Sequence, residues 1–394
     1  MALQFVLGGS GAGKSTYVFE KIIERSMKEE NKNFFILVPD QFTMQTQMEF
    51  VNRHPRGGIL NIDVLSFSRL AHRILQETGG ADAPVLDDTG KSLVLRKVAE
   101  ELKEEVPVLG GNLKKLGYIH EVKSAISEFM QYGIDDEKIK EMLQYTAKRG
   151  GLHGKLKDLG VLYQGFRRYI KDQYITTEET YDRLAEQLEK STLIPDSVIV
   201  LDGFTGFTPV QNRVIEKLLT LSEELYMTVT LDKRAMEADS DSGQLFDLSK
   251  KTIKSMEKLA KDNQIEIKPW IWMEDGGKRF THSPQLNHLE QNLFRYPYRQ
   301  MNGDTQEISI WEAENMELEV RNTCRKIREL LDEGYCYRDI AVIVSDLGTY
   351  GSMVEEIFDE YEIPLFMDQT RKITLNPFIE YIRSAIQVQV KQFS

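Results

Sequence analysis

The chain has 394 residues, a length that predicts two or three domains rather than one. Apolar residues make up 41% of it and charged residues 28%, which is typical of a globular protein and leaves no apolar run long enough to span a membrane. The net charge of −12 gives no general support for nucleic-acid binding.

The first third of the chain alternates strands and helices. Short apolar runs predict strands at residues 3–7, 34–38 and 62–65, and helical spacing predicts helices at 14–27, 44–51 and 69–76. The run at 34–38 is continuous, as in a parallel strand that is covered on both faces. Repeated β-α order predicts a parallel sheet with right-handed crossovers, which later strands at 198–201 and 226–231 are expected to join.

A glycine-rich segment lies between the first strand and the first helix. Residues 8–15 read GGSGAGKS, which matches the phosphate-binding P-loop pattern Gly-x-x-x-x-Gly-Lys-Ser/Thr. Glycines let backbone N–H groups converge on phosphate oxygens, and the helix N-terminus adds its dipole. We therefore predict an α/β domain of the P-loop NTPase class. Its predicted ATP ligands are Gly8, Ser10, Gly11, Ala12, Gly13, Lys14, Ser15 and Thr16.

Two of these residues have specific roles in such a site. Lys14 would reach the β- and γ-phosphates, and Ser15 would bind Mg²⁺. Asp202 directly follows the strand at 198–201, where a second Mg²⁺ ligand is expected.

Hydrolysis needs more than these ligands, namely a group that activates water. Helicase motors carry Glu directly after the metal-binding Asp, whereas Gly203 follows here and residues 203–206 hold no carboxylate. Such motors also read adenine with a glutamine upstream of the P-loop, and only seven residues precede Gly8. We assign no catalytic residue and expect binding with little or no hydrolysis. A carboxylate from elsewhere in the chain remains the alternative.

The character of the sequence changes near Gly79. From residue 87 to about 190 only helical periodicity is present, which predicts an all-helical insertion. Beyond a polar connector at 273–303, apolar runs predict strands at 308–311 and 340–344 and helices at 316–331 and 377–388. This second α/β unit has one β-α-β and little more, so we expect the chain to be a fragment.

Several segments resemble the AddB family, the B subunit of the bacterial AddAB helicase–nuclease. They are LVPDQFT at 37–43, VLSFSRLAHR at 64–73, LDGFTGFTP at 201–209, SPQLNHLE at 283–290, YRDIAV at 337–342 and IPLFMD at 363–368. The resemblance covers essentially the whole chain. It implies a superfamily 1 helicase-like core that keeps a nucleotide site but has lost motor function.

The resemblance also implies a biological setting. A partner A subunit drives translocation, and the B core scans single-stranded DNA for the Chi sequence while double-strand breaks are processed for recombination. A nuclease domain with an iron–sulfur cluster would lie beyond residue 394. The parts expected here are a first RecA-like domain at 1–85 and 193–290, the helical insertion at 86–192, and a truncated second RecA-like domain at 305–394.

In a helicase-like core the loops after the strands line the single-strand channel. Amides and hydroxyls read base edges, phenylalanines stack on bases, and arginine binds phosphate. For the phenylalanines ordinary core packing stays equally open, as does an ordinary surface position for His72. For Gln41 and Thr43 a helix cap or a solvated turn stays open. The residues that the resemblance implies are Gln41, Thr43, Phe67, Arg69, His72, Phe204 and Phe207.

The insertion carries a local basic excess, with 12 Lys/Arg against 7 Asp/Glu in residues 111–171. Either a solvated helical face or DNA backbone contact explains it, and the insertion could also face the partner subunit. The candidate residues are Lys114, Lys115, Lys148, Arg149, Arg167 and Arg168.

Two functional classes follow from these patterns. The first is a DNA-scanning module whose nucleotide is structural, and the alternative is an active ATP-dependent DNA helicase motor. A small-molecule kinase fits poorly, because it leaves the insertion without a purpose. We expect no secretion signal before the first strand, and the two cysteines lack CxxC spacing. We therefore expect a cytoplasmic protein with reduced thiols.

Overall fold

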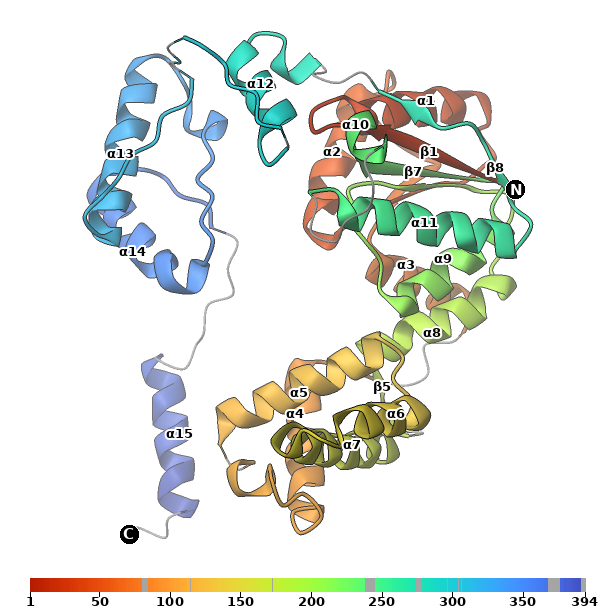
Figure 1. Cartoon of the computed structure of the whole chain (residues 1–394), viewed down its shortest axis with the longest axis vertical. Helices are drawn as coiled ribbons and strands as arrows, with labels where there is room; N and C mark the ends of the chain where they lie inside the picture. The colour runs from red at the N-terminus through yellow and green to blue at the C-terminus, as the bar shows by residue number, and fades with distance from the viewer. Residues whose placement is uncertain are drawn as a thin grey trace. The chain divides into compact units, whose positions relative to one another are not determined.

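The computed structural model describes residues 1–79, 84–113, 115–171, 173–237, 245–273, 278–295, 297–303, 305, 307–367 and 376–390. Two compact units make up the chain, Met1–Glu307 and Ile308–Ser394 (Figure 1). Among the described residues, no helix has the length and apolar character needed to cross a membrane.

A parallel sheet forms the centre of the first unit, as predicted. Its strands lie in the order β3 (Ile62–Leu65), β2 (Phe34–Leu37), β6 (Val198–Leu201), β7 (Glu224–Thr230), β1 (Ala2–Gly8) and β8 (Glu266–Ile267). A further strand, β9 (Ile271–Trp272), also pairs with β1. All of these pairs are parallel, so the carboxyl ends of β1, β2, β3, β6 and β7 lie at one edge of the sheet.

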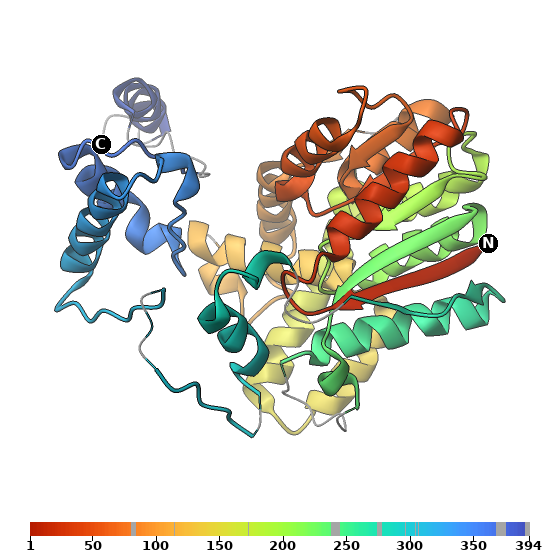
Figure 2. The same ribbon diagram turned by 90° about the horizontal axis from the view of Figure 1, so that it is seen from above.

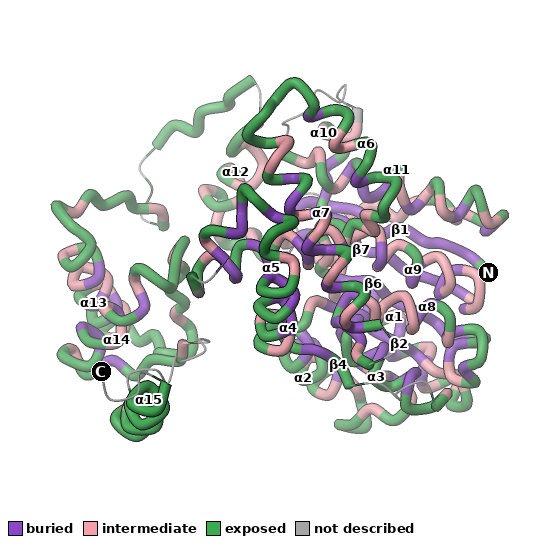
Figure 3. The backbone as a smooth tube through the Cα atoms, turned by 90° about the horizontal axis from the view of Figure 1, so that it is seen from below, coloured by how far each residue is buried: buried purple, intermediate pink, exposed green. Residues whose placement is uncertain are grey.

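Helices cover both faces of the sheet because successive strand residues point to opposite sides. Phe5 and Met227 belong to a core shared with α3 (Phe67–Thr78), α9 (Pro209–Leu221) and α11 (Asp247–Asp262). Val6 and Ile36 belong to the other core, shared with α1 (Lys14–Lys28) and α2 (Thr43–Arg53). Figure 2 shows α1 and α11 on opposite sides of the sheet, and Figure 3 shows the strands as a buried layer.

The segment between β3 and β6 is mostly helical. Its helices α4 (Asp88–Glu101), α5 (Leu116–Gln131), α6 (Asp136–Thr146) and α7 (Gly150–Ile170) share an apolar core of their own, and α8 (Thr177–Gln187) follows them. The prediction of helices alone across residues 87–190 was wrong at one point. Strand β5 (Ile175–Thr176) pairs with β4 (Val85–Leu86), and two residues are too few for a strand period to be visible in the sequence.

Other short elements connect these parts. The polar stretch predicted as a connector at 273–303 contains a helix, α12 (Pro284–Asn292), which the sequence did not reveal because none of its residues is buried. The remaining short elements of the first unit are η1 (Asp40–Phe42), η2 (Gly110–Asn112), η3 (Leu188–Lys190), α10 (Lys233–Glu237) and η4 (Lys278–Phe280).

The second unit contains α13 (Met316–Asp332), η5 (Tyr337–Asp339), α14 (Leu347–Glu360) and α15 (Pro377–Val390). The strands predicted at 308–311 and 340–344 are absent from this described part of the chain, and Ile310 and Ile343 are 95% and 94% exposed. A strand needs a neighbour to pair its backbone groups, and neither run has one here. The prediction of these two strands was therefore wrong.

A buried ion pair joins α4 to α8. The Lys91 ammonium donates to both carboxylate oxygens of Glu178, at 2.9 and 2.8 Å, and the two side chains are only 5% and 8% exposed. Each charge is therefore compensated mainly by the other.

Removing one partner is expected to destabilise the protein strongly. Glu178→Leu leaves a buried ammonium without its carboxylate, so the free energy of unfolding should fall by about 3 kcal/mol. The double variant Lys91→Met/Glu178→Leu removes both charges and should recover most of that loss. Thermal unfolding of the three proteins measures this, and an equal loss in the single and double variants would contradict it.

Candidate functional site

The glycine-rich loop at residues 8–14 joins β1 to α1 at the carboxyl edge of the sheet. Leu231 N donates to Gly8 O at 3.1 Å, and Tyr17 N donates to Gly13 O at 2.9 Å, so both ends of the loop are bonded to neighbouring structure. Gly13 has a φ of +89°, a left-handed conformation that glycine adopts without strain. This conformation turns the chain from the strand into the helix.

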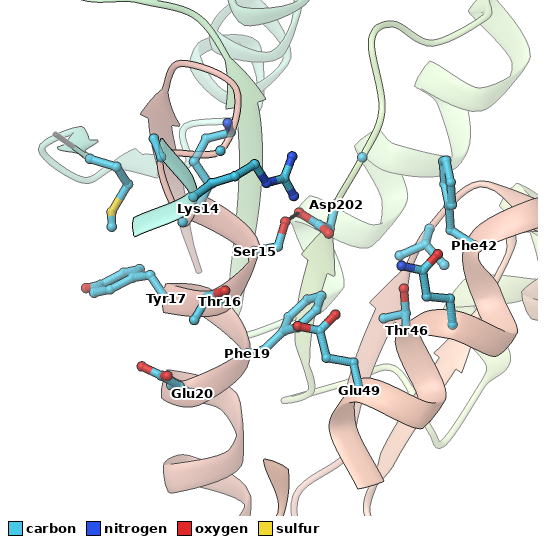
Figure 4. A pocket seen from close by; sticks show the side chains of 18 residues that line it. Lys14, Ser15, Thr16, Tyr17, Phe19, Glu20, Phe42, Thr46, Glu49 and Asp202 are labelled. Carbon is cyan, nitrogen blue, oxygen red and sulfur yellow. Dashed lines mark hydrogen bonds between the residues drawn. The ribbon is translucent and has the colours of Figure 1, made fainter. Parts of the chain in front are cut away.

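A pocket of about 520 Å³ opens at this loop between α1 and α2 (Figure 4). Six of the eight predicted nucleotide ligands line it, and Gly8 and Ser10 do not. Asp202, predicted as a Mg²⁺ ligand, and Gly203 beside it also line the pocket, whereas the sequence did not indicate the other residues of the wall. The wall consists of Gly11, Ala12, Gly13, Lys14, Ser15, Thr16, Tyr17, Phe19, Glu20, Val38, Phe42, Gln45, Thr46, Glu49, Asp202, Gly203, Met273 and Arg279.

Lys14 provides a positive charge at the pocket. Its ammonium donates to the carbonyl oxygens of Gly8 and Gly9, at 3.1 and 2.8 Å. Burial lowers the pKa of Lys14, while the carboxylates of Asp202 and Glu290 act in the opposite direction. An ionised phosphate oxygen is a stronger acceptor than these neutral carbonyls, so the side chain has a better partner available in an anionic ligand.

Asp202 lies directly after β6 and faces the start of α1. Its Oδ1 accepts hydrogen bonds from Ser15 Oγ at 2.9 Å and from Thr228 Oγ1 at 2.5 Å, and the residue is only 8% exposed. Burial raises the pKa of the Asp202 carboxyl, and the bonds from Thr228 and Ser15 oppose this rise. The structure thus brings together the two residues predicted to bind Mg²⁺ (Figure 4).

This pair fits the preference of Mg²⁺ for hard oxygen ligands. The ion usually takes one or two carboxylates, keeps several waters, and completes its shell with substrate phosphates. The Ser15 hydroxyl, at the end of the P-loop pattern, and the Asp202 carboxylate, which follows β6, match that pattern.

The turn after Asp202 carries no acid. Gly203 has a φ of +78°, and no carboxylate follows it through residue 206. Among the described residues, the other carboxylates in the pocket wall are Glu20 on α1 and Glu49 on α2. The negative charge of Glu49 contributes to the raised pKa of Asp202, and Glu49 also pairs with Arg53 at 2.7 Å.

The residues predicted to contact DNA follow β2, β3 and β6, which are neighbouring strands. Gln41 in η1 and Arg69 and His72 on α3 are exposed. Thr43 is buried, and its hydroxyl donates to the carbonyl oxygen of Asp40 at 3.0 Å. Three of these polar side chains therefore lie at the surface, whereas the hydroxyl of Thr43 forms a hydrogen bond within the turn at the start of α2.

The three predicted phenylalanines form one aromatic cluster. Phe67 lies 5.5 Å from Phe204 and 6.1 Å from Phe207, measured between ring centroids, and the latter two are 5.1 Å apart. Phe67 is only 3% exposed and belongs to the core, so its ring is not accessible to a base. Phe204 and Phe207 are half-buried against it and keep some exposed surface.

The basic candidates of the helical segment lie at its surface. Lys115, Lys148, Arg149, Arg167 and Arg168 are exposed, and Lys114 falls outside the described residues.

Comparisons with known proteins give a consistent result. The family model described as "ADDB, N-terminal" matches residues 5–290. Over its whole length the chain is 42% identical to a protein of Lachnoclostridium phytofermentans, 36% to one of Caldanaerobacter subterraneus subsp. tengcongensis and 33% to one of Clostridium kluyveri. Each of the three is named as the B subunit of an ATP-dependent helicase/deoxyribonuclease, and the chain covers only 34–35% of their lengths.

Asp202→Asn is expected to stabilise the nucleotide-free protein at neutral pH. Because burial raises the folded-state pKa above the ordinary value of 3.8, ionising this carboxyl costs stability at every pH above the folded-state pKa. The amide removes that cost, and its oxygen can still accept from Ser15 and Thr228. The gain should shrink as the pH falls toward 3.8, where Asp202 is increasingly protonated in both states. Thermal unfolding across this pH range measures it, and a variant that is less stable at neutral pH would contradict it.

Proposed function

Because this chain belongs to the AddB family, we propose that it is the nucleotide-binding, DNA-scanning part of a helicase–nuclease. In this proposal it binds ATP with Mg²⁺, contacts single-stranded DNA along the carboxyl edge of its sheet, and works with a partner A subunit in the cytoplasm. Its role would be to scan for the Chi sequence while double-strand breaks are processed for recombination, without acting as the motor.

One observation carries the nucleotide proposal. Ser15 and Asp202 are hydrogen-bonded at the pocket, where the glycine-rich loop and Lys14 also meet. Loop amides and the N-terminus of α1 would bind the phosphates, and Lys14 would exchange its carbonyl partners for phosphate oxygens. Bound Mg²⁺ would neutralise phosphate charge, and Ser15 and Asp202 would hold it.

The proposal of an inactive motor rests on the turn after Asp202. The position that holds a water-activating carboxylate in helicase motors is Gly203, whose positive φ disfavours any side chain. The space around it is open, since a Cβ there would lie 3.6 Å from Pro39 Cδ. The backbone conformation, rather than crowding, therefore opposes an acid at this position.

The alternative, an active ATP-dependent helicase motor, has one observation in its favour. Glu49 reaches the same pocket from α2, so a carboxylate other than residue 203 is available to orient water (Figure 4). An ion pair with Arg53 fixes the orientation of the Glu49 carboxylate.

The DNA proposal rests on exposed side chains that follow adjacent strands. Gln41 and Arg69 supply an amide and a guanidinium, and Phe204 and Phe207 supply partly exposed rings. Phe67 would support these rings rather than touch a base. Exposed basic residues of the helical segment would add backbone contacts.

Titration calorimetry should detect ATP–Mg²⁺ binding by the 394-residue chain, and Lys14→Ala should weaken it by about tenfold or more through loss of a charged phosphate contact of about 1.5–3 kcal/mol. A hydrolysis assay on the same sample should show background turnover, with or without single-stranded DNA. Undetectable nucleotide binding would refute the ATP site. Rapid DNA-stimulated turnover that Glu49→Gln abolishes would establish the motor alternative.

Gly203→Glu is expected not to create a motor. A non-glycine residue at φ +78° costs about 1–2 kcal/mol of backbone strain, which pulls the new carboxylate away from the geometry that catalysis needs. A strand-separation assay with single-stranded-tailed duplexes measures the outcome. DNA unwinding by the Gly203→Glu single variant would contradict this expectation, because it would show that only the acid at residue 203 was missing for motor activity.

Arg69→Ala should weaken single-stranded DNA binding and lower the slope of log affinity against log salt by about 1, because one phosphate contact is lost. Arg56→Ala is the matched control, since Arg56 is exposed but precedes β3 at the opposite edge of the sheet. Fluorescence anisotropy at several salt concentrations measures both slopes. Equal effects of the two substitutions would contradict the proposed DNA edge.

A further inference from the structure

The glycine-rich loop contains more glycines than its motif requires. The motif fixes Gly8 and Gly13, whereas Gly9 and Gly11 are additional. A Cβ on Gly9 would lie 3.0 Å from Glu290 Oε1, and a Cβ on Gly11 would lie 3.0 Å from Phe280 and 3.1 Å from Arg279. These two glycines therefore allow η4 and α12 to lie directly against the loop.

The contact with α12 is a specific hydrogen bond. Ser10 N donates to Glu290 Oε1 at 3.0 Å, and the two residues are 280 positions apart in sequence. Neither Ser10 nor Glu290 belongs to the pocket wall, so the carboxylate holds the loop from outside the pocket. An amide bonded to a carboxylate is a charge-assisted pair, which is stronger than a bond between neutral groups.

Glu290 is itself fixed by a second contact. Arg295 donates to the backbone oxygen of Glu290, and its guanidinium lies 3.7 Å from the carboxylate. The same guanidinium donates to Asp232 Oδ2 at 2.7 Å and covers the ring of Phe246. Because Asp232 follows β7, the loop is connected through Glu290 and Arg295 back to the sheet.

The helix that carries Glu290 buries little apolar surface. None of the residues of α12 is buried, and Leu286 and Leu289 are exposed. An element with so little buried apolar area separates from its neighbours at lower cost than a core helix does. The position of α12 therefore depends largely on polar contacts such as the bond to Ser10.

From these contacts we propose that Glu290 is a positioning residue of the nucleotide site. It holds the glycine-rich loop in the conformation that binds phosphate, so the docking of α12 sets the affinity of the loop for ATP. The second half of this statement rests on the proposed ATP binding. Without the bond, the loop must be ordered when the ligand arrives, and that ordering reduces the affinity.

Two measurements on the 394-residue chain test the proposal. In nucleotide-free protein, Glu290→Ala should speed hydrogen exchange at the Ser10 amide, since its acceptor is gone. In calorimetry with ATP–Mg²⁺, the same substitution should weaken binding about tenfold, as expected for loss of a charge-assisted bond. Glu290→Gln keeps an acceptor oxygen and should bind within about threefold of the unmodified chain, since only the charge is lost.

A double-mutant cycle sharpens the test. Gly9→Ala places a methyl group against the Glu290 carboxylate and should displace it, so its effect on ATP affinity should match that of Glu290→Ala. The effects should not add when the two are combined, because they remove one interaction. Leu289→Ala, on the same helix, is the matched control and should leave ATP affinity unchanged.

The outcomes separate this proposal from the proposed function. Unchanged exchange at Ser10 and unchanged ATP affinity in Glu290→Ala would overturn the positioning role while leaving ATP binding intact. Tighter ATP binding in that variant would also overturn it, since Glu290 would then compete with phosphate. If the unmodified chain binds no ATP, the proposed function fails. In that case the proposal that α12 sets the ATP affinity also fails. Hydrogen exchange at the Ser10 amide alone then decides whether Glu290 holds the loop.

Discussion

At the carboxyl edge of the sheet, three elements are joined by hydrogen bonds to one buried side-chain oxygen, Asp202 Oδ1. Asp202 directly follows β6, accepts a hydrogen bond from Ser15 at the start of α1, and accepts another from Thr228 on β7. A buried carboxylate without donors would be strongly unfavourable, so these two hydroxyls are what permit it to remain here. The Asp202 side chain thus links β6, α1 and β7 through hydrogen bonds, and it also lines the pocket.

The sequence predicted the features that local patterns encode. Strands covered on both faces appear as continuous apolar runs, such as residues 34–38, and the glycine-rich motif lies between a strand and a helix. The contact between Ser15 and Asp202 followed from topology, because parallel strands bring their carboxyl ends together. Glu49, Arg279 and Glu290 were not predictable in this way. They lie on helices or turns outside the phosphate-binding motif, and only the three-dimensional packing brings them to the loop.

The errors share a physical cause, which is that a strand is defined by its partner. Residues 308–311 and 340–344 have the composition of strands, yet no neighbour pairs their backbone groups among the described residues. Conversely, Ile175 and Thr176 form a strand because the chain before α4 lies beside them. Helix α12 was not predicted for a related reason. Its outward-facing residues bury no apolar stripe, so no helical period marks it in the sequence.

The turn after Asp202 connects the two proposed activities. Gly203 lines the pocket at the glycine-rich loop, and the next residue, Phe204, packs against Phe67 and Phe207 in the aromatic cluster. A carboxylate at residue 203 would need a non-glycine residue in a left-handed conformation, and relaxing that strain would move Phe204 as well. Water activation at this turn and the present placement of the aromatic rings are therefore in conflict. Glycine at residue 203 therefore preserves the arrangement of the rings on which the proposed DNA contact depends.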